Sequence, residues 1–217
     1  MLGKWTSILA IAITIIAFAI GMVKILINRK PLYFKLIICS AGCYALEQLS
    51  YLVSLLCGTS NSFWIGMIGM FGCTFFLFSA DYGVFDKIVD DGSQKKARRQ
   101  ALIAPLLFGT IIIGLFFHWI VEDVFWAIFL TALSVPIIPA SYFSLKHILL
   151  PYDEVGLLKG TRQCNIIELV FYTVMIASNY AIWIESVLLV CISNLLLAVT
   201  ELVLVLVSIN GVKQWKI

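Results

Sequence analysis

Four acidic residues lie inside segments that are otherwise apolar, namely Glu47, Asp81, Glu168 and Glu201. An acid such as Asp at the centre of a membrane helix costs about 2.5–3.5 kcal/mol. We therefore expect acids in such positions to serve a function or to make contacts between helices. Carboxyl groups removed from water can hold protons, bind cations or hydrogen-bond to a neighbouring helix. The chemistry predicted for this chain is that of buried carboxyl groups.

Polar residues around these acids recur at steps of three and four, which places them on one face of each helix. In the second apolar segment that face carries Ser40, Tyr44, Glu47, Tyr51 and Ser54, and in the sixth it carries Thr161, Asn165, Glu168, Tyr172 and Asn179. We expect these faces to meet inside a bundle or to line a polar cavity. The predicted substrate-binding or proton-coupling residues are Glu47, Tyr51, Asp81, Glu168, Tyr172, Asn194 and Glu201.

The acids have no evident cationic partner, because no Lys or Arg lies in the middle of an apolar segment and both His118 and His147 lie near segment ends. Three outcomes stay open for them: protonated acids bonded to Tyr and Asn, binding of a metal or cationic solute, or proton exchange during transport. Polar contacts that only hold helices together are the simpler alternative. The six Cys form no closely spaced ligand pattern, so we expect apolar packing from them and assign no metal site and no cofactor.

The elements that must position these residues are transmembrane helices. The chain is 62% hydrophobic and 12% charged, whereas a soluble domain is about 45–50% apolar and about 25% charged. Seven apolar runs are long enough to span a bilayer as helices. They cover Trp5–Ile27, Tyr33–Cys57, Phe63–Phe85, Ala101–Trp119, Val124–Leu145, Cys164–Ile184 and Ser186–Ile209. Gly66, Gly69 and Gly72 predict close helix packing in the third run, and Pro136 and Pro139 predict a kink in the fifth.

Lys and Arg occur almost only in alternate connections, those after the first, third, fifth and seventh runs. Positive residues favour the cytoplasmic side. We therefore expect the N-terminus outside, the C-terminus inside, and a multi-pass location in the plasma (inner) membrane. The net charge of +3 follows from these loops, and no nucleic-acid partner is expected.

The chain also repeats itself. Five residue pairs recur 119 to 121 positions apart: Pro31 and Pro151, Glu47 and Glu168, Tyr51 and Tyr172, Trp64 and Trp183, and Asp81 and Glu201. The repeat divides a single transmembrane domain, residues 1–217, into a first half of three helices (1–86), a linker helix (87–123) and a second half (124–217). An odd linker gives both halves the same orientation, a parallel repeat. In this respect the chain resembles the seven-helix, 3+1+3 architecture of the SWEET and PQ-loop group. The Pro-Gln dipeptide of that group is absent, so no site residue carries over.

These patterns favour a small transporter or facilitator of a polar or cationic solute, in which the carboxyl groups could also couple transport to protons. Its expected partners are the lipid bilayer and that solute, with a homodimer left open. A seven-helix receptor, sensor or accessory subunit is one alternative. An intramembrane lipid hydrolase with paired carboxylates is another, although an enzyme is not favoured because neither His-Glu-x-x-His nor Gly-x-Ser-x-Gly occurs.

Overall fold

The computed structural model of the chain describes residues 2–27, 30–57, 63–86, 95–150, 156–184 and 186–214, and every element within these ranges is helical. Turns with i→i+5 hydrogen bonding, the π-helix, are labelled η. The elements are α1 (Leu2–Gly21), η1 (Met22–Leu26), α2 (Leu32–Cys57), α3 (Phe63–Phe78), η2 (Ser79–Asp86), α5 (Lys95–Ala101), α6 (Ile103–Trp119), α7 (Val124–Ser134), α8 (Ile137–Leu149), α9 (Gly156–Trp183) and α10 (Val187–Gln214).

Within these ranges, six helical stretches are long and apolar enough to cross a membrane. They are Trp5–Leu26, Leu32–Val53, Lys95–Trp119, Val124–Leu149, Gly160–Ile182 and Val187–Val212, and a shorter apolar helix covers Ile68–Val84. The chain is therefore an all-helical, multi-pass membrane protein, as predicted. Several helices extend beyond the predicted apolar runs: α9 begins at Gly156, not at Cys164, and α5 begins at Lys95.

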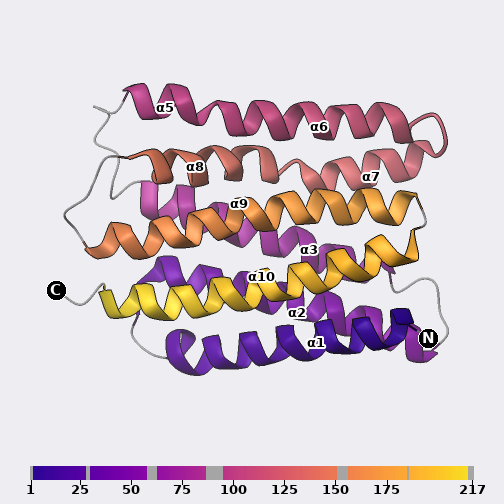
Figure 1. Cartoon of the computed structure of the whole chain (residues 1–217), viewed down its shortest axis with the longest axis horizontal. Helices are drawn as coiled ribbons and strands as arrows, with labels where there is room; N and C mark the ends of the chain where they lie inside the picture. Colours follow the sequence, from indigo (N-terminus) through magenta and orange to yellow (C-terminus); the bar gives the residue numbers. More distant parts are fainter. Residues whose placement is uncertain are drawn as a thin grey trace.

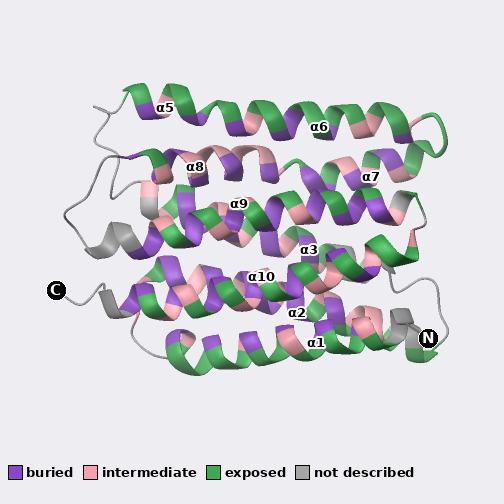
Figure 2. Cartoon of the chain, viewed as in Figure 1, coloured by how far each residue is buried: buried purple, intermediate pink, exposed green. Residues whose placement is uncertain are grey.

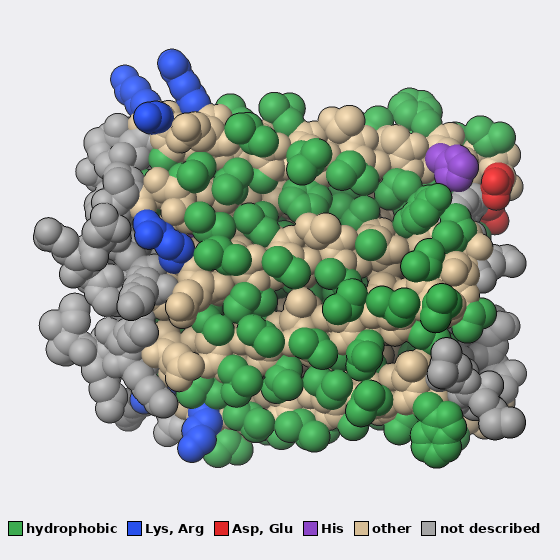
Figure 3. Space-filling model, viewed as in Figure 1, with side chains coloured by type: hydrophobic (Ala, Val, Ile, Leu, Met, Phe, Trp, Pro, Cys, Tyr) green, Lys and Arg blue, Asp and Glu red, His purple; other side chains and the backbone are tan. Residues whose placement is uncertain are grey.

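The surface of the protein differs from that of a soluble protein, and buried acids are present inside a mainly apolar core. Large apolar side chains such as Leu106, Ile128 and Val187 are exposed, while Glu168 and Glu201 are completely buried. Figure 2 shows exposed positions along the outer sides of α1, α5 and α6 and buried positions on the sides that face the bundle. On the face seen in Figure 3, Lys and Arg lie at one end of the molecule and acidic side chains at the other, with an apolar surface between. This surface suits contact with lipid.

The helices pack as a ring, with the pair α5 and α6 outside it. Contacts run from α1 to α2, from α2 to α3, from α3 and η2 to α8, and then through α9 and α10 back to α1. The pair α5 and α6 packs on the outside of α7 and α8, and α2 and α3 lie behind α9 and α10 in Figure 1. Residues far apart in sequence therefore meet inside one ring.

A break divides the fifth apolar segment, as the prolines predict. Helix α7 ends at Ser134, Pro136 precedes α8, and Pro139 falls in the first turn of α8. Proline has no N–H to donate and its ring crowds the preceding turn, so the regular helix is interrupted there. Both α7 and α8 pack on α6, but beyond the break α8 also contacts α9 and η2.

The glycines of α3 bring this helix close to α2, as predicted, at the two positions where the neighbouring atoms are described. A Cβ at Gly69 would lie 2.7 Å from the carbonyl oxygen of Cys43 and 2.9 Å from Cβ of Glu47. A Cβ at Gly72 would lie 3.0 Å from Sγ of Cys43. Small residues allow such backbone approach between membrane helices, and here that approach sets the position of Glu47.

Candidate functional site

The local winding of η2 brings two aspartates to one neighbour. Asp81 and Asp86 are five residues apart, and in an α-helix of 3.6 residues per turn they would point about 140° away from each other. The i→i+5 turns of the π-helix bring residues at this spacing nearer to one face. Both aspartates contact His147 of α8. The departure from α-helical geometry therefore builds part of the site.

Asp86 binds two neighbouring side chains of α8. Its Oδ1 lies 2.5 Å from Nζ of Lys146 and 3.2 Å from Nε2 of His147, and both of these side chains are almost completely buried. Burial alone would raise the pKa of Asp86, but the hydrogen bonds from His147 and Lys146 outweigh it and hold the pKa below the ordinary value of 3.8. Asp86 is thus a carboxylate, and it fixes the buried end of α8.

Ser144 stands between two buried acids of different helices. Its Oγ lies 2.9 Å from Oδ2 of Asp81 and 3.1 Å from Oε2 of Glu168, and also 3.1 Å from the carbonyl oxygen of Ala140. A hydroxyl group has one proton to donate and two lone pairs to accept with. It cannot donate to three acceptors at once. Both carboxyl contacts are hydrogen bonds when one of the two carboxyl groups carries a proton and donates it to Ser144, while Ser144 donates to the other.

On the other side, Nδ1 of His147 lies 3.7 Å from Oδ1 of Asp81. Asp86, His147, Asp81, Ser144 and Glu168 therefore form one continuous series of polar groups, which we name the inner series. It begins at Asp86, the last residue of η2, and leads to Glu168 within α9. Three helical segments supply it, which explains why no sequence motif marks it.

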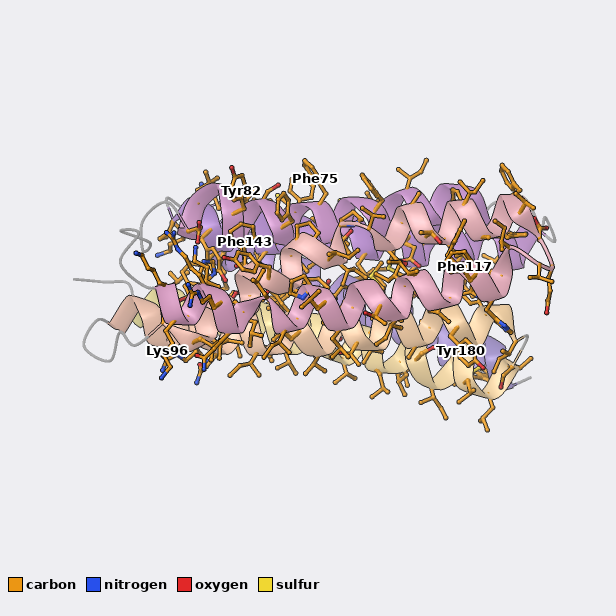
Figure 4. The ribbon with its side chains drawn as sticks, turned by 90° about the horizontal axis from the view of Figure 1, so that it is seen from above. Phe75, Tyr82, Lys96, Phe117, Phe143 and Tyr180 are labelled. Atoms are coloured by element: carbon orange, nitrogen blue, oxygen red, sulfur yellow. The ribbon has the colours of Figure 1, made fainter. Side chains whose placement is uncertain are left out.

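Aromatic rings pack beside the inner series. The ring of Phe143 lies 5.1 Å from that of Tyr82 and 6.3 Å from the imidazole of His147, measured between centroids, and Nζ of Lys146 lies 5.6 Å from the Phe143 centroid. Figure 4 shows Tyr82 and Phe143 near the same end of the bundle as Lys96. Because an aromatic face attracts a cation, Phe143 both covers the series and helps to hold Lys146.

A second group surrounds Glu201 near the middle of α10. Its Oε1 lies 3.2 Å from Sγ of Cys73 and 3.5 Å from Oγ of Ser40, and those two atoms are 3.1 Å apart. Glu47 of α2 lies near enough for its charge to interact with that of Glu201. We name Glu47, Glu201, Ser40 and Cys73 the central group. It joins α2, α3 and α10 across the ring.

Several carboxyl oxygens at these sites have no hydrogen-bond partner within the described ranges. They are Oδ1 of Asp81, Oε1 of Glu168, Oε2 of Glu201 and Oε2 of Glu47. Both amide atoms of the buried Asn165 also lack a partner in the described part of the chain. A buried polar atom without a partner costs about 1–3 kcal/mol. Such atoms are sites where a proton, a water molecule or a positively charged ligand would be stabilised.

The structure brings together some of the predicted site residues. Asp81 and Glu168 meet at Ser144, Glu47 and Glu201 share the central group, and Tyr172 is completely buried one turn from Glu168. Tyr51 and Asn194 are only half-buried, and neither makes a hydrogen bond to these groups in the described part of the chain. Pro151 and the side chains of Trp64 and Trp183 lie outside the described residues.

The expectation that the acids lack an internal cationic partner was wrong for Asp81, which pairs with His147. His147 was expected near the end of an apolar segment, and Lys146 in the connection that follows it, but α8 continues to Leu149 and both side chains are buried. Ser144, His147, Lys146, Asp86 and Cys73 were not predicted as site residues. The signal that could have found two of them is the spacing of Ser144 and His147, three apart and preceded by Ser141, which marks a polar face on α8.

Among the residues that the structure describes, no three His, Cys, Asp or Glu side chains are grouped so as to hold a metal ion. No family model, curated protein or solved structure matches the chain. The fold and the site together define a class: a multi-pass helical membrane protein whose interior carries carboxyl groups from several helices.

Proposed function

We propose that the chain is a small membrane transporter of a polar or cationic solute, with the inner series and the central group as its site and proton carriers. The observation that carries this proposal is the excess of buried acid. Asp81, Glu168 and Glu201 are completely buried, and His147 forms an ion pair with one of them, Asp81. Lys146 is already bound to Asp86. The remaining charge must be balanced by protons or by a positive ligand.

In this proposal the short apolar helix Ile68–Val84, with the start of α3, crosses the membrane as a seventh span. The N-terminus lies outside and the C-terminus inside. The gathering of Lys and Arg at one end of the molecule supports this orientation, because positive residues favour the cytoplasmic side. The inner series would then open toward the cytoplasm.

We also propose that the two triple-helix halves are a parallel repeat. Two features are compatible with it. Each half contributes three consecutive segments to the ring, and the first segment of each half contacts the last segment of the other, α1 with α10 and α8 with α3. The same exchange relates the acids, since Asp81 and Glu168 correspond to Glu201 and Glu47. A site between such halves suits alternating access.

Reconstitution of the purified protein in liposomes tests the transport function. A pH-sensitive dye is trapped inside, a panel of Na⁺, K⁺, guanidinium and tetramethylammonium salts is added outside, and proton movement is recorded. We expect at least one cation to move protons, and we expect Glu168→Gln and Glu201→Gln to abolish the response. Glu122→Gln is the matched control, because Glu122 is exposed between α6 and α7.

Absence of cation-driven proton movement with the wild-type protein would contradict a proton-coupled cation transporter. Release of a product from the liposome lipids in the same preparation would instead favour the hydrolase. A response that survives in both Gln variants would remove the carboxyl groups from the mechanism.

A further inference from the structure

We propose that the inner series is a proton pathway, in which His147 passes protons between Asp86 at the Lys-rich end and the Asp81–Glu168 pair inside the bundle. This inference rests on the proposed function only for the use made of the proton. Its geometry is continuous: four links join five groups at 3.2, 3.7, 2.9 and 3.1 Å. Each of the five groups can both accept and release a proton.

The transfer balances at each step. When His147 is the tautomer that carries its proton on Nδ1, a proton from the solvent at the end of η2 passes by way of Asp86 to Nε2, and the proton on Nδ1 leaves to Oδ1 of Asp81. The imidazole must then turn over to restore the first tautomer before the next proton can pass. The carboxyl group of protonated Asp81 turns so that its proton faces Oγ of Ser144 and donates to it, and the serine's own proton passes to Oε2 of Glu168. One proton has moved from Asp86 to Glu168, and the serine is unchanged apart from the direction of its O–H bond.

The link between His147 and Asp81 controls the pathway. Three of the links lie within hydrogen-bond range, but 3.7 Å between Nδ1 and Oδ1 does not. The imidazole must approach by about 0.7 Å before a proton can pass. Asp86 and the ring of Phe143 hold His147 on its other sides, so this small motion is the natural point of regulation.

Other titratable groups surround the pathway and belong to its electrostatics. Lys146 faces Asp86 from α8, and Tyr33, Cys164, Tyr172 and Glu201 interact with Glu168 or Asp81 from α2, α9 and α10. All except Lys146 are neutral or negative. A proton that reaches Glu168 therefore enters a region that favours positive charge, which makes Glu168 the inner end of the pathway.

Infrared spectroscopy of the purified protein in lipid nanodiscs tests the pathway without any solute. The C=O stretching band of a protonated carboxyl group shifts in D₂O. The band of the Asp81–Glu168 pair is identified as the one that disappears from the spectrum of the Glu168→Gln variant. We expect this band to exchange rapidly in the wild type and roughly tenfold or more slowly in His147→Gln. His118→Gln is the matched control: it removes the only other histidine, which is exposed near the end of α6, and we expect wild-type exchange.

A second pair of variants decides the matter if His147→Gln does not fold. Ser144→Ala removes the link to Glu168, and Ser141→Ala makes the same change in a buried residue one turn earlier whose hydroxyl donates to Ile138. We expect slower exchange at Glu168 only in Ser144→Ala. Wild-type exchange in folded His147→Gln, or in Ser144→Ala, overturns the pathway. Slow exchange in these variants combined with no cation-driven flux would keep the pathway and remove the transporter proposal.

Discussion

Gly69→Ala is expected to destabilise the protein because it adds a methyl group where α3 touches the backbone of α2. That methyl would lie 2.7 Å from the carbonyl oxygen of Cys43, whereas ordinary contacts begin at 3.4 Å. The helices must separate by about 0.7 Å, the difference between these distances. Carbonyl oxygens cannot rotate away as a flexible side chain can, so the whole helix has to move.

The magnitude follows from two opposing effects. Overpacking in a well-packed interior costs about 1–3 kcal/mol, and replacing glycine by alanine within a helix returns about 0.5–1 kcal/mol. Gly114→Ala of α6 isolates the second effect, because a Cβ there meets nothing within 4 Å. The free energies of unfolding of the two variants should therefore differ by about 1–3 kcal/mol, with Gly69→Ala less stable.

Unfolding in mixed detergent micelles, followed by circular dichroism, measures this difference. Gly72→Ala should fall between the two, because its close neighbour is the thiol of Cys43, a side-chain atom that can turn. Gly69→Ala should also weaken any carboxyl-dependent transport, since Cβ of Glu47 lies 2.9 Å from the added methyl. Equal stability of Gly69→Ala and Gly114→Ala would show that the α2–α3 contact is looser than described and would refute the reasoning.

Three further predictions concern the acids and the orientation. Glu201→Met should leave the free energy of unfolding unchanged or raise it while abolishing transport, because a buried acid with an unsatisfied oxygen is a poor stabiliser. A loss of about 2 kcal/mol or more in chemical denaturation would show instead that Glu201 stabilises the contact between helices. The lowered pKa of Asp86 contributes stability above the ordinary value of 3.8 that is lost as the pH falls through the folded pKa. Lys146→Gln should thus raise the pKa of Asp86 and lower the melting temperature at pH 7, with the difference from wild type vanishing in acid, and a difference that persists at low pH would assign the effect to packing. Cys57 is exposed at the end of α2, and a membrane-impermeant maleimide should label it only from the outer side of intact cells. Cys57→Ser is the control, and labelling from the inner side would contradict the proposed orientation.

The sequence allowed the helices and their polar faces to be predicted, because lipid imposes long apolar runs and makes each buried acid conspicuous. The break at Pro136 was equally predictable, since proline lacks the N–H that a continuous helix needs. The close packing at Gly69 followed from glycine alone. These are properties of single segments, and periodicity reports them directly.

The partners of the acids depended on how helices meet, which periodicity does not report. Ser144 binds both Asp81 and Glu168 only because η2, α8 and α9 converge. The predicted apolar run ends at Leu145, so His147 and Lys146 were expected outside the buried part of the helix. Helix α8 instead continues to Leu149, and both side chains are buried. The π-helical winding of η2 could not be predicted either, since its composition is compatible with an ordinary α-helix.

The π-helical turn also makes the length of this segment matter more than its composition. Asp81 and Asp86 share a neighbour because the wider turn accommodates one residue more than an α-helix would. Deleting Gly83, where a side chain would meet nothing within 4 Å, would leave the aspartates four apart and still on one face of an ordinary α-helix. A substitution that forced α-helical winding at the present length would turn Asp86 away from His147. A one-residue deletion, normally the harsher change, is here the one that preserves alignment.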